Sequence, residues 1–187
     1  MSSTLRRDMK KLKISQHDTQ SLIANIGRTI FIGDWKPDYI VGIVRGGLMP
    51  ALYLSHYLNV PMHTLNVSLR DGESGESNLW MAEDALGPNT RARVEDGKIW
   101  SHKNILIVDD INDQGTTLNW IMDDWKSSCF PGDPSWDEVW NQNVRFAVLV
   151  DNLASACYVK MDYVGKEINK AEDPLWVDFP WEDWWTK

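Results

Sequence analysis

Cysteine is scarce in this chain of 187 residues, which contains only Cys129 and Cys157. Two cysteines are too few for a disulfide framework or a four-ligand zinc site, so we expect two reduced thiols.

No apolar run is long enough to span a bilayer, and the first residues lack the apolar segment of a signal peptide. We therefore expect no membrane partner and a cytoplasmic location.

Positive charge is also in short supply. The chain has 19 Lys and Arg residues against 27 Asp and Glu residues, which gives a formal net charge of −8. A surface with this balance is poorly suited to nucleic acid or to anionic membranes, so we expect no nucleic-acid partner. A phosphorylated small molecule remains compatible, because a metal ion and local backbone N–H groups can neutralise its charge.

What the chain does have is an alternation of strand-like and helix-like segments. Apolar, β-branched runs at residues 39–44, 62–69 and 144–150 predict strands, while residues 15–33 and 48–58 predict helices. This order is typical of an α/β domain with a mostly parallel sheet flanked by helices. Periodicity fades between residues 70 and 98, which predicts a long flexible loop there. Within 128–143, Trp136 and Trp140 predict a short helix.

The most informative segment is residues 105–118, where an apolar run leads into acidic residues and then a Gly-Thr-Thr turn. This order predicts a buried strand, a short loop and a helix that begins at Thr116 or Thr117. The start of such a helix offers backbone N–H groups and a positive dipole end to a phosphate. The carboxylates of Asp109, Asp110 and Asp113 would repel that phosphate, so they suit sugar hydroxyls, a cation or a proton. One ligand with a phosphate, a ribose and a metal ion would satisfy all these groups.

Residues 105–118 resemble the phosphoribosyl pyrophosphate (PRPP) signature of type I phosphoribosyltransferases. The chain departs from the usual pattern at Gln114, where the family has Thr or Ser, although an amide can still donate to a phosphate oxygen. The resemblance implies that Asp109 and Asp110 hold the ribose hydroxyls and Mg²⁺, directly or through water, and that Asp113 is the catalytic base. It also implies a PRPP-binding cradle for the 5′-phosphate, made by Gln114, Gly115, Thr116 and Thr117.

A second match lies one strand earlier, where the run at 39–44 ends in an Arg-Gly-Gly turn. The glycines let the backbone approach an anion closely, and the arginine adds a charge-assisted donor. In the family the corresponding loop binds pyrophosphate and often contains a non-proline cis peptide bond. The resemblance therefore implies a pyrophosphate site at Val44, Arg45, Gly46 and Gly47, with the cis bond between Val44 and Arg45.

The third match is at the C-terminal end, where residues 162–165 and 175–182 resemble the base-binding hood of 6-oxopurine phosphoribosyltransferases. The xanthine-guanine enzymes come closest in pattern. The resemblance implies that Trp176 stacks on a purine and that the backbone around Val177 reads the exocyclic groups of the base. Hydrogen-bonding pockets of this kind discriminate strongly between bases.

The identity of the base depends on the position after the strand at 144–150. Family members usually present there a lysine that donates to the 6-oxo group, but this chain has Asp151. Ionised Asp151 would accept a hydrogen bond from an exocyclic amine, which favours an aminopurine. Alternatively Lys160 or Lys166 supplies the donor, or the alignment shifts by a few residues.

Taken together, the three matches imply the type I phosphoribosyltransferase fold in a single domain. We expect a lead-in at 1–14, a core at 15–150 and a C-terminal hood at 151–187. The implied activity is transfer of the phosphoribosyl group of PRPP to a purine base (hypoxanthine, guanine or xanthine) in purine salvage, by a homodimer or homotetramer. The alternatives are a non-catalytic PRPP or nucleotide sensor, an enzyme for another base such as adenine or a pyrimidine, and a degenerate member kept for protein interactions.

Overall fold

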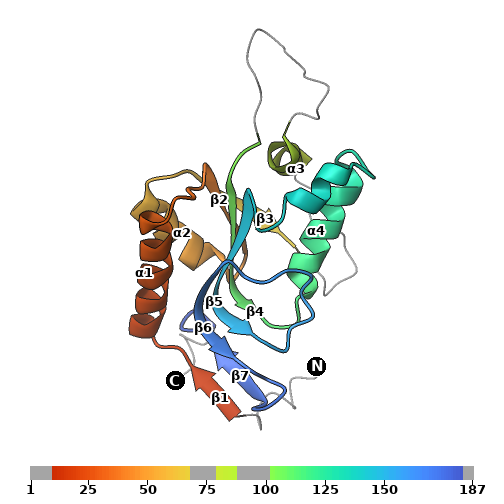
Figure 1. Ribbon diagram of the computed structural model, residues 1–187. Helices are drawn as coiled ribbons and strands as arrows, with labels where there is room; N and C mark the ends of the chain where they lie inside the picture. Colours follow the sequence, from red (N-terminus) through yellow and green to blue (C-terminus); the bar gives the residue numbers. More distant parts are fainter. Residues whose placement is uncertain (1–9, 68–78, 88–101, 183–187) are drawn as a thin grey trace.

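A five-stranded parallel sheet forms the centre of the molecule (Figure 1). The computed structural model describes residues 10–67, 79–87 and 102–182. The strand order is β3-β2-β4-β5-β6, and every neighbouring pair is parallel. The strands are β2 (Tyr39–Val44), β3 (Met62–Asn66), β4 (Ile105–Asn112), β5 (Val144–Asn152) and β6 (Tyr163–Ile168). The predicted α/β fold with a mostly parallel sheet is confirmed.

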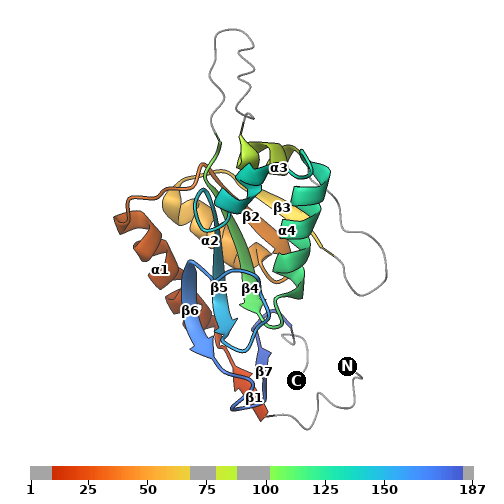
Figure 2. The same ribbon diagram turned by 45° about the vertical axis from the view of Figure 1, so that its right-hand side comes forward.

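Helices cover both faces of this sheet. Figures 1 and 2 show α1 (Gln16–Ile32) and α2 (Leu48–Leu58) on one side, and α3 (Leu79–Leu86) and α4 (Thr116–Ser128) on the other. Because successive strand residues point to opposite faces, Ile105 and Ile107 of β4 join the core beneath α3 and α4. Leu106 joins the core beneath α1 and α2. None of the described helices is long and apolar enough to cross a membrane.

The helix boundaries follow local capping chemistry. Ser15 caps α1 in a reciprocal capping box, since its side chain accepts from the N–H of Asp18 while the Asp18 carboxylate accepts from the N–H of Ser15. At the other end, Gly33 is the C-cap, and the Lys36 ammonium donates to three of the last carbonyls of this segment. The predicted boundaries of α2 agree with the structure, and α4 begins at Thr116.

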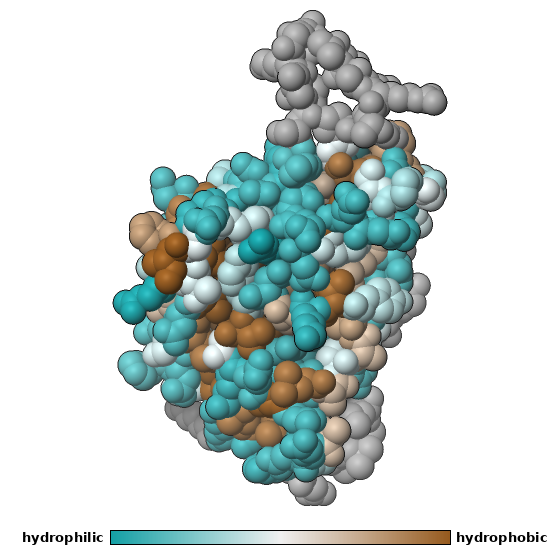
Figure 3. Space-filling view, in the orientation of Figure 1, coloured by the Kyte–Doolittle hydropathy of each residue, from teal (hydrophilic) through white to brown (hydrophobic). Residues whose placement is uncertain are grey.

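A second, two-stranded sheet corrects the predicted division of the chain. β1 (Lys10–Lys13) pairs in parallel with β7 (Leu175–Asp178), so residues 10–13 belong to the hood and not to a lead-in. β6, predicted as part of the hood, instead forms the edge of the main sheet next to β5. The first difference arises from pairing between segments at opposite ends of the chain, and the second from pairing between successive strands. Figure 3 shows apolar surface in several separate patches, one of them in the lower part of the view, where Figure 1 draws β7.

Two segments predicted as loop or insert contain short helices. Within 70–98, α3 buries Met81, Ala82 and Ala85 in the core, so that part of the predicted flexible loop is a packed helix. The rest of that loop, 70–78 and 88–98, lies outside the described residues. In the insert, a 3-10 helix, η1 (Pro134–Glu138), carries Trp136, which is fully buried and stacks on Trp140 with ring centroids 5.8 Å apart. Both tryptophans therefore contribute to the core.

Candidate active site

A cavity of about 360 Å³ lies between the carboxyl end of β4, the start of α4 and the hood strand β7. Ligands of open α/β sheets bind at this edge. The cavity is lined by Asp109, Asp110, Ile111, Asp113, Gln114, Thr116, Thr117, Lys170, Trp176, Val177, Phe179 and Glu182. Most of the residues predicted from the acidic run and the hood are thus brought together in one place.

The two adjacent carboxylates at the end of β4 carry a large electrostatic cost. The backbone N–H of Asp110 donates to Asp109 Oδ1 at 3.0 Å, which holds the Asp109 carboxylate against the backbone of its neighbour. Burial and the neighbouring Asp110 charge raise the pKa of Asp109 well above its usual value, and burial also raises the pKa of Asp110. A ligand that supplies positive charge or hydroxyl donors would relieve this cost.

The same pair suits Mg²⁺. Among the residues that the structure describes there is no cluster of three or more metal-binding side chains. Mg²⁺ is commonly bound by one or two carboxylates, with waters and substrate phosphates completing its coordination. Asp109 and Asp110 therefore fit an ion that arrives with a phosphorylated substrate, and they do not form a closed protein site.

The start of α4 is built to receive an anion. Gly115 is its N-cap with φ of 81°, and within the described part of the chain no side chain caps this helix end. The first N–H groups of α4 therefore have no capping side chain among the described residues, and Thr116 and Thr117 line the cavity wall beside them. A Cβ on Gly115 would overlap the backbone of Cys157, so the tight packing of this loop requires glycine.

The Arg-Gly-Gly loop adjoins the acidic pair without lining the cavity. The peptide bond between Val44 and Arg45 is cis, as the resemblance implied. A Cβ on Gly46 would overlap the Asp110 carboxylate, so this loop packs directly against the acidic pair. Gly47 is the N-cap of α2, where the described residues again provide no side-chain cap. The loop thus places a second helix start beside Asp110.

The cavity wall next to β7 contains a residue that was not predicted from the sequence. Lys170, in the turn between β6 and β7, pairs its ammonium with Asp113 Oδ1 at 2.6 Å. The same ammonium lies 5.9 Å from the ring centroid of Trp176. Val177 and Phe179 complete this wall. In the sequence, the only sign of this role was that a lysine stands six residues before Trp176. The position of Lys170 beside Asp113 depends on how the hood packs, which the local sequence does not specify.

Asp151 was predicted to contact the base, and the structure does not bring it to the cavity. Its carboxylate accepts a hydrogen bond from Asn112 Nδ2 at 2.8 Å, across the β4–β5 pair. Burial raises the pKa of Asp151. The two alternative lysines, Lys160 and Lys166, are also absent from the cavity lining, where the described lysine is Lys170.

A comparison with protein-family models decides the family. The model described as "Phosphoribosyl transferase domain" matches residues 8–183, nearly the whole chain. The chain belongs to the phosphoribosyl transferase family. Members of this family are PRPP-dependent transferases. The cavity described above corresponds to the acidic run, the helix start and the hood from which the family was inferred.

Individual relatives are distant. The crystal structure of a purine phosphoribosyltransferase from Pyrococcus horikoshii is 25% identical, with a TM-score of 0.61 over 93% of this chain and 95% of that one. A xanthine-guanine-hypoxanthine phosphoribosyltransferase from Helicobacter pylori shares the fold at 18% identity, with a TM-score of 0.59 and 93% coverage of both chains. Xanthine phosphoribosyltransferase 1 of Saccharomyces cerevisiae is 23% identical over 130 residues, which are 60% of this chain. The match spans 59% of that relative's length.

Proposed function

We propose that this phosphoribosyltransferase transfers the 5-phosphoribosyl group of PRPP to a 6-oxopurine, releasing pyrophosphate and forming a nucleoside monophosphate. The observation that carries the proposal is the pair of Asp113 and Lys170, 2.6 Å apart beside the Trp176 ring. This pair shares a cavity with the acidic residues of β4 and the start of α4. The names of the purine enzymes among the similar proteins point the same way.

The charge pair favours a particular edge of a purine. A 6-oxopurine presents a ring N–H donor next to a carbonyl acceptor, and the face of its ring can stack on Trp176. Asp113 can accept from the ring N–H, while Lys170, which can only donate, can bind the carbonyl oxygen. Adenine has an amino group in place of that oxygen, so its donor would face the Lys170 ammonium. Base selection thus follows from the hydrogen-bonding direction.

The residues of the cavity and of the adjoining Arg-Gly-Gly loop then have distinct tasks in the reaction. A ring nitrogen of the base forms a bond to C1 of the ribose as the bond between C1 and the pyrophosphate oxygen breaks. The proton on the base passes to the Asp113 carboxylate. The α4 start holds the 5′-phosphate, and the loop at Arg45 binds the departing pyrophosphate, on which negative charge grows in the transition state. Holding both substrates in line supplies much of the acceleration.

Magnesium has a defined place in this scheme. Purine phosphoribosyltransferases are generally Mg²⁺-dependent. When bound, the ion would neutralise charge on the pyrophosphate group. Asp109 and Asp110 would hold it, directly or through water, and would accept from the ribose hydroxyls. Removal of Mg²⁺ with EDTA is expected to abolish turnover.

The test is release of pyrophosphate from Mg-PRPP with hypoxanthine, guanine, xanthine and adenine offered separately. We expect turnover with at least one 6-oxopurine and about 10²–10⁴-fold slower turnover for Asp113→Asn, because the variant lacks the proton acceptor. Turnover with adenine alone would overturn the assigned base class. PRPP binding without turnover of any base would identify a sensor instead of an enzyme.

A further inference from the structure

Asn152, the last residue of β5, is almost completely buried and is hydrogen-bonded in three directions. Its Nδ2 donates to the backbone carbonyl of Asp113 at 2.7 Å. Its Oδ1 accepts from the backbone N–H of Lys170 at 3.0 Å and from that of Ala154 at 3.2 Å. One amide group therefore contacts the backbone of both members of the charge pair in the cavity.

The chemistry of these contacts fixes the orientation of the amide. A backbone carbonyl only accepts and a backbone N–H only donates, so the Nδ2 end must face Asp113 and the Oδ1 end must face Lys170. Asparagine offers a separate donor and a separate acceptor on one short, planar amide, so it can bond both backbones at once. The Asp113 loop and the turn that carries Lys170 are 57 positions apart in sequence, yet both are bonded to this one side chain.

The ends of the strands are held together independently of this side chain. The N–H of Leu153 donates to the Ile168 carbonyl at 2.8 Å, and Asn152 is paired with Ile168 in the β5–β6 register. On the other side, Asn112 Nδ2 donates to Asp151, and Asn112 Oδ1 accepts from Ser155 Oγ at 2.9 Å. Loss of the Asn152 amide would leave these contacts in place and release the two site segments, together with the local hydrogen bond from Ala154.

We propose that Asn152 is a positioning residue that sets the relative placement of Asp113 and Lys170, and so the fit of the cavity to the edge of the base. The inference rests on the proposed function and deepens it. Asn152 acts through two backbone groups and does not itself line the cavity. Its removal is expected to impair base selection more than PRPP binding.

The experiment compares two variants and a matched control. Asn152→Ala removes all three hydrogen bonds, whereas Asn152→Asp keeps an acceptor for Lys170 and Ala154 and loses the donor to Asp113. The control is Asn143→Ala. Asn143 is also a buried asparagine, at the opposite end of β5, and donates to the carbonyls of Ala85 and Lys103.

Three quantities are measured for each protein: kcat/KM with the preferred 6-oxopurine, kcat/KM with unsubstituted purine, and the Kd of Mg-PRPP. We expect Asn152→Ala to lower kcat/KM for the oxopurine by about 10–100-fold and to narrow the oxopurine-to-purine ratio by at least about 5-fold. The Kd of PRPP should stay within about 3-fold. Asn152→Asp should lower both kcat/KM values together and keep the ratio, because Lys170 stays anchored.

Amide hydrogen exchange gives a readout that does not require turnover. In Asn152→Ala, faster exchange is expected in residues 110–115 and 168–173, while Asn143→Ala leaves both segments unchanged. If Asn152→Ala changed neither the oxopurine-to-purine ratio of kcat/KM nor the amide exchange of these two segments, the positioning role would be overturned. Absence of turnover in the wild-type protein would instead overturn the proposed function, and the exchange pattern would still decide whether Asn152 places both segments.

Discussion

At the scale of single residues, Lys170 makes the sharpest prediction. Lys170→Met keeps the length of the side chain near Trp176 but removes the partner of Asp113 and the proposed donor to the base. Because a hydrogen bond to a charged group contributes about 1.5–3 kcal/mol, kcat/KM for the 6-oxopurine should fall about 10–100-fold. Lys166→Met is the control, since Lys166 is an exposed lysine of β6 outside the cavity lining. An equal fall in kcat/KM in the two variants would refute the role of Lys170 as the donor to the base.

Gly115 allows a second test at this scale. Gly115→Ala places a Cβ at a backbone φ of 81° and against the backbone of Cys157. Gly132→Ala is a matched control, because Gly132 has nearly the same φ, 82°, with nothing within 4 Å of an added Cβ. Both variants incur about 1–2 kcal/mol of backbone strain. In chemical denaturation, only Gly115→Ala should lower the free energy of unfolding by more than this strain. The same variant should also bind PRPP more weakly.

The contrast between Asp151 and Lys170 shows where residue-level prediction ends. The acidic run and the Gly-Thr-Thr turn are contiguous in sequence, so their place at the end of β4 followed from local pattern alone. Asp151 was aligned with the expected donor by its distance from a strand end, but its carboxylate is engaged by Asn112. Lys170 reaches the cavity through the turn between β6 and β7, whose position depends on tertiary packing.

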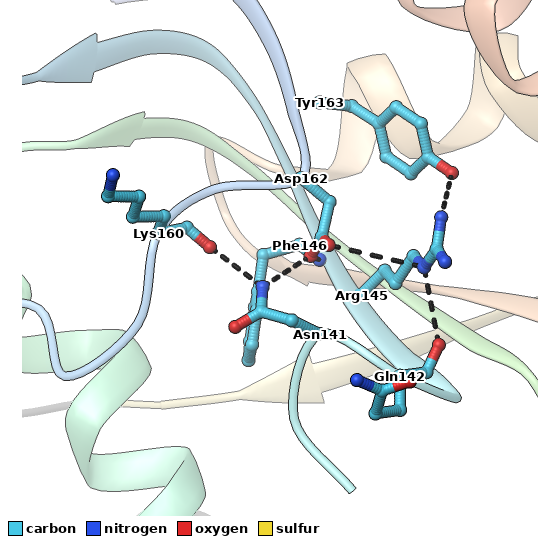
Figure 4. Close-up of polar contacts among 7 residues, drawn as sticks. All are labelled: Asn141, Gln142, Arg145, Phe146, Lys160, Asp162 and Tyr163. Atoms are coloured by element: carbon cyan, nitrogen blue, oxygen red, sulfur yellow. Dashed lines mark hydrogen bonds and ion pairs between the residues drawn. The ribbon is translucent and has the colours of Figure 1, made fainter.

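At the scale of elements, Asp162 links β5 to the segment that leads into β6 (Figure 4). One carboxylate oxygen accepts from the N–H of Phe146 at 2.8 Å and from Asn141 Nδ2 at 2.9 Å. Asp162→Ala leaves these donors without that acceptor, so the free energy of unfolding should fall by about 1–3 kcal/mol. Asp137→Ala, which removes a largely exposed carboxylate, is the control and should leave stability unchanged.

The same carboxyl group gives a pH dependence. Burial raises the pKa of Asp162 above 3.8 in the folded protein, so between these two values the folded state binds more protons than the unfolded state. The stability that comes from this proton uptake is therefore complete below 3.8 and is lost as pH rises through the folded pKa, while the hydrogen bonds that the carboxylate accepts remain. The stability difference between wild type and Asp162→Ala, measured by urea denaturation, should be larger near pH 4 than near pH 7. A stability difference between wild type and Asp162→Ala that grew as the pH rose would contradict a raised pKa for Asp162.

Elements were predictable to different degrees for physical reasons. The strand β2 and the first half of β4 are unbroken apolar runs, α1 has a capping box at Ser15, and α2 has Pro50 in its first turn, so the existence of all four followed from sequence. α3 is only eight residues long and its buried face is small, so its pattern was hidden in a polar segment. The pairing of β1 with β7 joins residues 165 positions apart, and no local signal encodes such a contact.

At the scale of the whole molecule, β1 pairs with β7, the strand whose Trp176 and Val177 line the cavity and are proposed to contact the base. In the β1–β7 register Lys11 lies opposite Trp176, and the N–H of Ile14 donates to the Asp178 carbonyl at 2.9 Å. Leu175 and Val177, on either side of the tryptophan, are buried in the core beneath α1 and α2. The orientation of the Trp176 ring therefore depends on β7 being held flat against this core by β1.

Deletion of residues 1–13 tests this dependence, with deletion of residues 1–9 as the control that keeps β1 intact. Without β1, the β7 backbone loses its strand partner within the described small sheet, and Trp176 loses its fixed placement. KM for the base should rise about 10-fold or more, because a misplaced contact surface weakens alignment of the substrates. The Kd of Mg-PRPP should change by less than about 3-fold, since the α4 start and the acidic pair belong to the main sheet and its loops. If both deletions left the base KM unchanged, β7 would be held by core packing alone, and the role given to β1 would be wrong.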